Sequence, residues 1–276
     1  MNSLLYYYNN VQKMAAYRQA KRMQRGVKLG YGETGVYSST TSAKLLLSDP
    51  ISIGTSDFTI EYYGNAYGSG SISSPLLFNK ASIGSAAISS YFQVYGLSLG
   101  KNNLNWVTFG IPGGGNITTD SLFFNYSAPT LDDKFHLVIT RAGKTIRVYI
   151  DNVLVASKEQ TEIKDMGEFV LGVANSSDVG FVRAWNYALS ADDVTAHYNN
   201  GDPMGYVVPK AKRAGLLAEY LPQNLMYGRD DKTIATSWLD SAKQMPLSDE
   251  YMEPLFQSIG GYDMAANGAP EILYNE

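Results

Sequence analysis

The sequence predicts an all-β fold, an antiparallel β-sandwich preceded by one α-helix and followed by a C-terminal extension. Three observations predict this class. Apolar and polar residues alternate with a period of two across residues 135–157, short apolar runs recur roughly every 8–12 residues, and turn-forming residues separate the runs. Among 276 residues there are 26 glycines and 21 tyrosines, a composition typical of twisted strands joined by many turns.

Residues 3–25 predict an amphipathic helix. The segment contains no Gly or Pro, and its apolar residues recur at spacings of three and four until Gly26 ends the pattern, with two arginines in the last turn. Five basic residues make it a candidate anchor or oligomerisation arm: Lys13, Arg18, Lys21, Arg22 and Arg25. A helix packed on the sandwich with a solvated basic face explains the same pattern, and its tyrosine-rich stripe is a poor lipid-binding face. We assign residues 1–28 to this arm.

Residues 33–203 predict the sandwich itself. Before its centre we expect short strands near residues 45–47, 57–63, 76–78, 83–88, 91–95, 97–99, 106–109 and 122–124. Stretches rich in Gly, Ser and Pro separate these strands and predict loops, for example at residues 112–115.

The centre of the sandwich is the stretch FHLVITRAGKTIRVYIDNVLVAS at residues 135–157. Its alternation predicts three antiparallel strands with one buried face. The residues expected on that face in the first two strands are Phe135, Leu137, Ile139, Ile146, Val148 and Ile150. Asp151-Asn152 predicts a two-residue hairpin turn before the third strand, because Asn tolerates the positive φ that such a turn needs.

A short helix is expected at residues 191–198. Ser190 followed by Asp193 has the form of a capping box, in which the serine hydroxyl accepts the third helical N–H. This assigns Asp192 and Asp193 to helix capping and to the helix dipole, with a catalytic role as the less favoured alternative. Residues 204–276 predict a basic linker, a strand at 216–221 that returns to the sheet, and an acidic extension. Little periodicity marks the last 30 residues, which we expect on the surface or against a neighbour.

Three segments in this order resemble laminin G-like domains of the concanavalin A-like lectin/glucanase superfamily, over roughly residues 36–203. They are DFTIEYY at 57–63, the central meander, and GFVRAWNYALS at 180–190 leading into the short helix. The resemblance implies a pentraxin-like jelly roll. It leaves function open, because lectins, adhesion modules, glycosidases and spacers share the fold. It also makes calcium at the sandwich rim a candidate, through Asp132, Asp133, Asn175 and Asp178.

Charge and composition exclude several classes. The net charge of −4 argues against nucleic acid as a partner, and there is no cysteine for a disulfide or a thiolate site. Residues 1–32 carry six basic and no acidic residues, whereas residues 244–276 carry six acidic and no basic ones. No apolar run is long enough for a membrane helix, and apolar residues precede the basic ones at the N-terminus, the wrong order for a secretory signal.

Catalytic and metal-binding patterns are weak. The paired-acid strand motif of glycosidases does not occur; Glu162, Asp165 and Glu168 have a period of three that scatters them over both faces of a strand. Asp57 and Glu61 are expected on one strand face, with Glu61 in a structural strand. The two histidines, His136 and His197, are interpreted as structural. We therefore expect no catalytic residue, no cofactor and no protein-built metal site, with calcium as the only candidate ion.

These observations favour a non-enzymatic binding or structural module of a larger assembly. The hypothesis is a phage virion protein, a head or tail fibre or decoration subunit, that forms a homo-oligomer, contacts other virion subunits through its oppositely charged ends and binds host surface glycans. The alternative is a carbohydrate-binding or adhesion module on a bacterial surface, with tyrosines and Trp106 stacking on sugars. A glycoside hydrolase is less favoured. Neither a nucleic-acid nor a membrane partner is expected.

Overall fold

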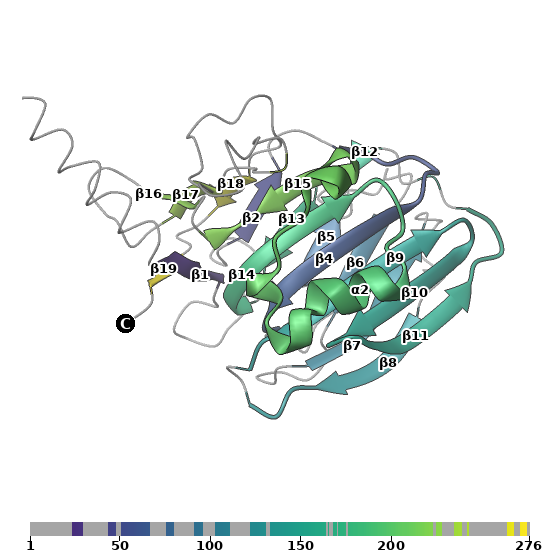
Figure 1. Cartoon of the computed structure of the whole chain (residues 1–276), viewed down its shortest axis with the longest axis horizontal. Coiled ribbons are helices and arrows are strands. Elements are labelled where there is room, and N and C mark those ends of the chain that lie inside the picture. The colour runs from purple at the N-terminus through teal and green to yellow at the C-terminus, as the bar shows by residue number, and fades with distance from the viewer. Residues whose placement is uncertain are drawn as a thin grey trace, which may run out of the picture.

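Two antiparallel sheets pack face to face, and one α-helix lies across the outer face of one sheet (Figure 1). The fold comes from a computed structural model that describes residues 24–29, 44–47, 51–66, 76–79, 91–95, 103–110, 122–130, 133–163, 165, 168–169, 171–174, 176–222, 225–227, 235–238, 242, 264–267 and 271–274. Within these ranges, no helix has the length and apolar character needed to cross a membrane.

The front sheet lies beneath the helix and has eight strands among the described residues. Its order is β11-β10-β9-β4-β14-β1-β19, with β15 also paired to β14. The bounds are β1 Gln24–Leu29, β4 Phe58–Gly64, β9 Phe135–Ala142, β10 Thr145–Ile150, β11 Val153–Glu159, β14 Ser176–Trp185, β15 Leu216–Tyr220 and β19 Glu271–Tyr274. The helix α2, Ala191–Tyr198, follows β14 and is continued by short 3-10 turns at Asn199–Gly201, Pro203–Gly205 and Lys210–Gly215.

The back sheet has nine strands in the described part of the chain, in the order β16-β17-β18-β2-β13-β5-β6-β7-β8. Its bounds are β2 Lys44–Leu47, β5 Leu77–Asn79, β6 Tyr91–Tyr95, β7 Asn103–Gly110, β8 Leu122–Ser127, β13 Leu171–Ala174, β16 Leu225–Tyr227, β17 Ala235–Trp238 and β18 Met264–Asn267. A separate small ladder joins β3, Ile51–Ser52, to β12, Glu168–Phe169. Every pairing described is antiparallel, as the sequence predicted.

The predicted meander is confirmed. Strands β9, β10 and β11 pair in order, and Asp151 and Asn152 form the predicted turn with φ values of 49° and 65°. This left-handed conformation is the one that a two-residue hairpin requires. Gly143 turns the chain between β9 and β10 with φ of 55°, and a Cβ there would meet no atom within 4 Å.

The core between the sheets takes one face of each strand. Alternate residues of β4, β9, β10 and β14 pack there against β5, β6, β7 and β8 of the other sheet. The expectation of a single buried face is wrong for β9, where His136, Val138 and Thr140 are also buried. A second apolar cluster around Trp185 and Val194 explains this, because α2 and the following turns cover the outer face of the front sheet.

The ends of the chain differ from expectation. Residues 24–29 form β1, which pairs with β14 and β19, so Arg25 lies in a strand and not in the last turn of a helix. The rest of the predicted helix lies outside the described residues. The strand predicted at 216–221 is present as β15. The last 30 residues are not only surface chain, since β18 joins the back sheet and β19 joins the front sheet.

Candidate functional site

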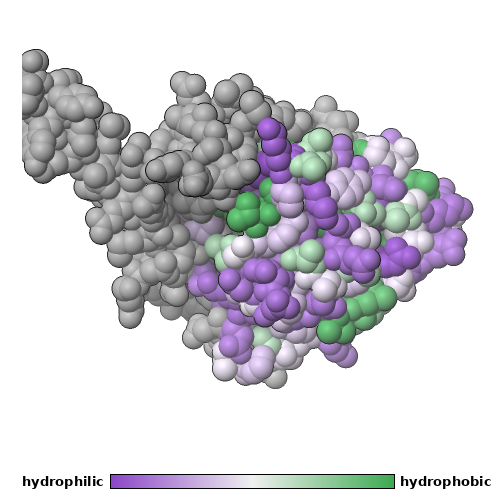
Figure 2. All heavy atoms as spheres, viewed as in Figure 1, coloured by the Kyte–Doolittle hydropathy of each residue, from purple (hydrophilic) through white to green (hydrophobic). Residues whose placement is uncertain are grey.

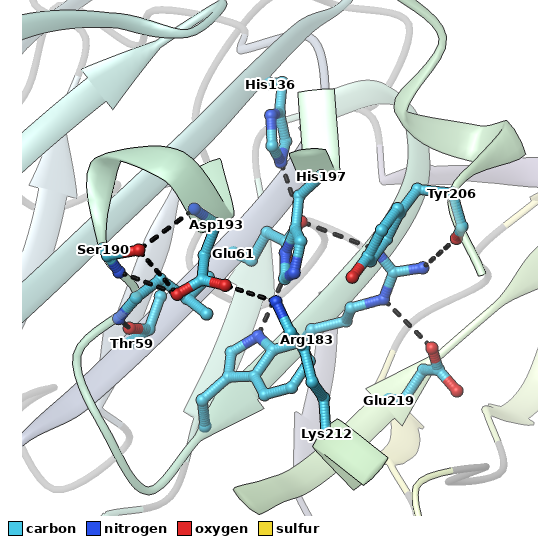
Figure 3. A network of polar contacts seen from close by, with 12 residues as sticks. Thr59, Glu61, His136, Arg183, Ser190, Asp193, His197, Tyr206, Lys212 and Glu219 are labelled. Carbon is cyan, nitrogen blue, oxygen red and sulfur yellow. Dashed lines mark hydrogen bonds and ion pairs between the residues drawn. The ribbon is translucent and has the colours of Figure 1, made fainter. Parts of the chain in front are cut away.

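A fully buried carboxylate, Glu61 of β4, is the centre of a polar network under α2 (Figure 3). Its Oε1 accepts a hydrogen bond from His136 Nε2 at 2.8 Å. Its Oε2 accepts from Trp185 Nε1 at 3.2 Å and from His197 Nδ1 at 3.3 Å. These donors come from β9, β14 and α2, so a single carboxylate connects the helix to three neighbouring strands of the sheet.

Charges of alternating sign cross the front sheet in one row. The register pairs Arg183 of β14 with Glu61 of β4 on one side and with Glu219 of β15 on the other side. Arg183 Nε lies 3.0 Å from Glu219 Oε1, and its Nη1 lies 3.4 Å from Glu61 Oε1. The remaining donor, Nη2, reaches the backbone oxygen of Tyr206 at 3.2 Å, and Arg213 closes the row with a 3.0 Å bond to Glu219. Each buried charge therefore has a partner of opposite sign.

The network keeps Glu61 ionised. Burial alone would raise the pKa of this carboxyl, but the charge of Arg183 and hydrogen bonds from His136 and His197 outweigh burial and hold the pKa well below its usual range. Because a carboxylate only accepts, each histidine donates one N–H to it. The other ring nitrogens, His136 Nδ1 and His197 Nε2, are buried without a hydrogen-bond partner.

Helix α2 is fixed over this network at its N-terminal end. Ser190 Oγ accepts from Asp193 N at 3.1 Å, and the Asp193 carboxylate accepts from Ser190 N at 3.1 Å. The predicted capping box is therefore confirmed. Lys212 pairs with the same carboxylate, and these contacts lower the pKa of Asp193 despite partial burial. Below the helix, Thr59 donates to the Tyr187 carbonyl and accepts from Leu189 N, each at 2.9 Å.

This arrangement holds the structure together and is closed to a ligand. Glu61, His136 and His197 each have an exposed fraction of 0 %. Figure 2 shows the surface above them covered mainly by hydrophilic and neutral residues. The network therefore has acids and bases but no path for a substrate, and the interpretation of both histidines as structural agrees with their burial.

A rim of tyrosines and carboxylates lies beside the network, where β4, β8 and α2 end. We call the following residues the tyrosine rim: Tyr63, Tyr126, Lys134, Asp151, Asp178, Tyr198 and Asp202. The three tyrosine rings are partly exposed, and nearby aspartates act electrostatically on Tyr63 and Tyr126. Sequence reasoning missed this set, because its members are far apart in the chain and only the strand pairing brings them together.

The buried network supports the rim from below. The Tyr198 ring stacks on His136 with centroids 6.2 Å apart, and His136 is held by Glu61. Tyr63 stacks on Phe181 at 5.7 Å, and Arg183 lies 4.1 Å from the Phe181 centroid. The rim rings therefore have fixed positions before any ligand arrives, which lowers the entropic cost of binding.

The polar groups of the rim include both hydrogen-bond donors and acceptors. Tyr126 donates its hydroxyl to Asp151 Oδ2 at 3.3 Å, and Asp151 Oδ1 accepts from the His136 backbone N–H at 2.8 Å. Lys134 lies 3.0 Å from the Asp178 carboxylate and 5.8 Å from the Tyr63 centroid. Burial and then the neighbouring aspartates raise the pKa of both Tyr63 and Tyr126, so these hydroxyls keep their protons as donors.

The acids considered from sequence lie in different surroundings. Asp57 is exposed and accepts the Gly143 N–H at 2.7 Å, whereas Glu61 is buried. Glu162 and Asp165 are exposed, and Glu168 lies in β12.

The calcium candidates are only partly described. Asp178 pairs with Lys134, and Asp133 Oδ2 accepts from Thr130 N at 2.8 Å. Asp132 and Asn175 lie outside the described residues. Among those described, no three His, Asp or Glu residues form a group that could hold a metal ion.

The anchor residues are also only partly described. Arg25 lies in β1, at the edge that pairs with the C-terminal strand β19. Lys13, Arg18, Lys21 and Arg22 lie outside the described residues, so their anchor role stays a prediction.

Comparison with known proteins shows the fold. No family model and no curated protein match the chain. A Bacteroides ovatus protein, described provisionally as carbohydrate-binding, superposes with a TM-score of 0.52 at 10% identity, over 92% of this chain. The chain spans 60% of that protein's length. The chain has an antiparallel jelly-roll β-sandwich fold. The resemblance to laminin G-like domains in particular stays a resemblance.

Two weaker likenesses lie below the level that shows a shared fold. One is to a heptameric pentraxin of Limulus polyphemus, with a TM-score of 0.44 and 10% identity, over 63% of this chain and 82% of that chain. The other is to a tailspike protein of an Escherichia coli O157:H7 bacteriophage, with a TM-score of 0.43 and 12% identity, over 74% of this chain and 29% of that chain.

Proposed function

We propose that the chain is a non-enzymatic glycan-binding module of a larger assembly, and that the tyrosine rim is a binding site. The observation that carries this proposal is the pre-positioned rim itself, with three partly exposed tyrosines among aspartates and a lysine. Tyrosine offers apolar area and a hydroxyl at low entropic cost. Carboxylates and tyrosine hydroxyls complement sugar hydroxyls, which both donate and accept hydrogen bonds.

A binding role fits the chemistry better than hydrolysis. Glycoside hydrolysis needs two carboxyl groups on either side of a reachable sugar bond. The most strongly perturbed carboxylate, Glu61, is buried and neutralised by Arg183. On the rim, Asp178 is paired with Lys134, and Asp151 already accepts from Tyr126 and from a backbone N–H. These contacts hold acceptors in place and leave no free general acid among them.

The larger assembly is proposed to be a phage virion, where the module binds host surface glycans and other copies of itself. Support comes from the charge of the ends, six basic residues in 1–32 against six acidic in 244–276, which favours docking between subunits. Mass spectrometry of particles purified from lysed host cultures tests this, since a virion subunit sediments with the particle. Recovery from the bacterial envelope in uninfected cells would favour a bacterial adhesion module instead.

The rim is tested with a glycan array probed by the whole chain and by Tyr126→Phe and Tyr198→Phe. Loss of one hydroxyl bond should weaken binding by about 1 kcal/mol, or about fivefold. Tyr187→Phe is the matched control, because Tyr187 is partly exposed but lies beside Trp185. Glycans should be bound and recovered intact. Equal binding by all variants would show that the rim is not the site, and released sugar products would show an enzyme.

A further inference from the structure

An exposed methionine lies beside the tyrosine rim. Met204 belongs to the 3-10 turn Pro203–Gly205, which follows Asp202 of the rim, and its side chain is 37% exposed. Its sulfur lies next to the ring of Tyr63, because a Cβ added to Gly180 of β14 would be 2.8 Å from Tyr63 Cδ1 and 3.0 Å from Met204 Sδ. Glycine at position 180 therefore leaves room for both side chains over β14.

Two partly exposed apolar groups meet at this point of the rim. Tyr63 lies in β4 opposite Phe181 of β14, and their rings stack with centroids 5.7 Å apart. Sulfur beside an aromatic ring is a favourable contact, and the flexible thioether side chain adapts to irregular apolar shapes. We call Tyr63, Gly180 and Met204 the apolar corner. It offers a contact for a small apolar group of a ligand, with the tyrosine ring already held in position.

Charged groups of both signs surround the apolar corner. Asp202, Asp151 and Asp178 all act electrostatically on Tyr63. Lys134 Nζ lies 5.8 Å from the centroid of the same ring and 3.0 Å from Asp178 Oδ2. Like charges brought together are unfavourable, so the carboxylates disfavour an anionic substituent and the lysine disfavours a cationic one. The surroundings therefore favour a substituent that is neutral and polar.

Both donors and acceptors are available for such a substituent. Asp202 is exposed, and its Oδ1 accepts from Gly205 N at 3.2 Å, which holds the carboxylate beside the turn that carries Met204. An ionised carboxylate has about four lone-pair sites, so Asp202 can accept a further hydrogen bond. The Lys134 ammonium is a donor. A secondary amide, which donates through N–H and accepts through its carbonyl, matches this pair of groups.

We propose that the tyrosine rim recognises an N-acetylated hexosamine unit, with the acetyl methyl group on the apolar corner. An acetamido group is neutral and combines a methyl group, an N–H donor and a carbonyl acceptor. The methyl contacts Tyr63 and Met204, Asp202 accepts the N–H, and Lys134 donates to the carbonyl. A hydroxyl at the same position of the sugar leaves the apolar corner without a contact. The inference rests on the proposed glycan-binding function of the rim and names its ligand class.

The test is isothermal titration of the whole chain with three trisaccharides. The trimers of N-acetylglucosamine, glucose and glucosamine share one backbone and differ only in an acetamido, hydroxyl or ammonium group on each ring. The acetylated trimer should bind at least about fourfold more tightly than the glucose trimer, the effect of burying one methyl group. The pair N-acetylgalactosamine and galactose repeats the comparison for a second hexosamine.

Variants of Met204 assign the preference to the apolar corner. Met204→Ser should reduce the preference for the acetylated sugar to less than about twofold, because the methyl group loses its apolar partner, and should bind the glucose trimer as the native chain does. Met204→Leu keeps an apolar side chain of similar volume and should keep the preference. Leu154→Ser is the matched control, since Leu154 is also an exposed aliphatic residue, at 49% on β11, and lies outside the rim.

The inference and the proposed function fail in different ways. Equal binding of acetylated and hydroxyl sugars in both series, still weakened by Tyr126→Phe, would overturn the inference and leave the rim as a glycan site. Tighter binding of the glucosamine trimer than of the acetylated one would overturn it and show selection for positive charge. A preference that Met204→Ser leaves intact would also overturn it, because the acetyl group would then lie elsewhere. No binding of any glycan would refute the proposed function itself.

Discussion

The two outer faces of the sandwich differ in composition and in what covers them. The front face carries Glu61, Arg183, two histidines and Glu219, and α2 with its following turns lies over them. In the back sheet, β5, β6, β7 and β8 contain no charged residue, and Phe123 of β8 is 73% exposed. Both faces belong to similar antiparallel strands. The difference teaches that polar residues on a sheet need not face water, and apolar residues need not face the core.

Burying the front face requires a complete set of partners. An ionised group taken from water costs several kcal/mol unless ion pairs and hydrogen bonds replace its hydration. Here the alternating row of Glu61, Arg183 and Glu219 supplies those partners, and the helix completes them through His197. Phe123 of β8 needs no such set, because it carries no charge to be compensated. The buried network of the front face therefore contributes to stability, whereas the exposed ring of Phe123 contributes little.

The largest effect is expected from Glu61→Gln. Gln keeps the shape but removes the charge opposite Arg183, which then keeps only Glu219 as a buried partner. We expect a loss of about 3 kcal/mol in the free energy of unfolding, which is the lower end of the range for breaking a buried ion pair. Urea denaturation measures it. Asp57→Asn, at an exposed residue just before the same strand, is the control and should change stability by less than about 0.5 kcal/mol.

Acid should weaken the native chain more than the Glu61→Gln variant. The pKa of Glu61 is lower in the folded state than in the unfolded chain, so its contribution is complete above the unfolded value and is lost as pH falls toward the folded value. Denaturation between pH 7 and pH 3 should give a steeper decline for the native chain. The pKa of Asp193 is also lowered in the folded state, so Asp193 too contributes stability that is lost in acid. Comparing Asp193→Asn with Glu61→Gln separates the two contributions. Parallel curves for the native chain and Glu61→Gln would contradict the role of the network.

Ser190→Ala should have a moderate effect. It removes the hydroxyl that caps α2 by accepting from Asp193 N, and caps of this type contribute about 1 kcal/mol. Thermal unfolding gives the global change, and hydrogen exchange of residues 191–198 gives the local one. Exchange should accelerate in α2 more than in β9, because the helix opens first while the meander stays paired.

The smallest effect on stability is expected from Phe123→Ala. Its ring is mostly exposed, so the free energy of unfolding should change by less than about 0.5 kcal/mol. A loss of stability near that of Glu61→Gln would show that the back face is covered in solution as the front face is.

Local patterns predicted the local parts of the fold. The alternation of residues 135–157 gave three strands, Asp151-Asn152 gave the turn, and Ser190 with Asp193 gave the start of α2, because each signal lies within one short window. The same reasoning predicted β15. These elements depend on neighbours in the chain, which is the information that a sequence pattern carries.

The other parts of the fold depend on pairing between segments that are distant in the chain. Strand β1 at residues 24–29 pairs with β19 at 271–274, and no local period could reveal that partner. Within the last 30 residues, β18 likewise pairs with β2 at residues 44–47, far away in the chain. In β9, the polar side chains of His136 and Thr140 predicted a solvent-exposed face. The unbroken run FHLVIT is also typical of a strand that is buried on both faces, as β9 is. Sequence analysis placed Glu61 in a structural strand, but only the structure shows that its partners lie on β14 and α2.

Hydroxyl-radical labelling of the whole chain compares the two faces in a single measurement. The account predicts rapid oxidation of Phe123 and negligible oxidation of Trp185, despite the higher intrinsic reactivity of tryptophan, because their exposed fractions are 73% and 0%. Trp185 oxidised as fast as Phe123 in the free chain would contradict a closed front face and an open back face.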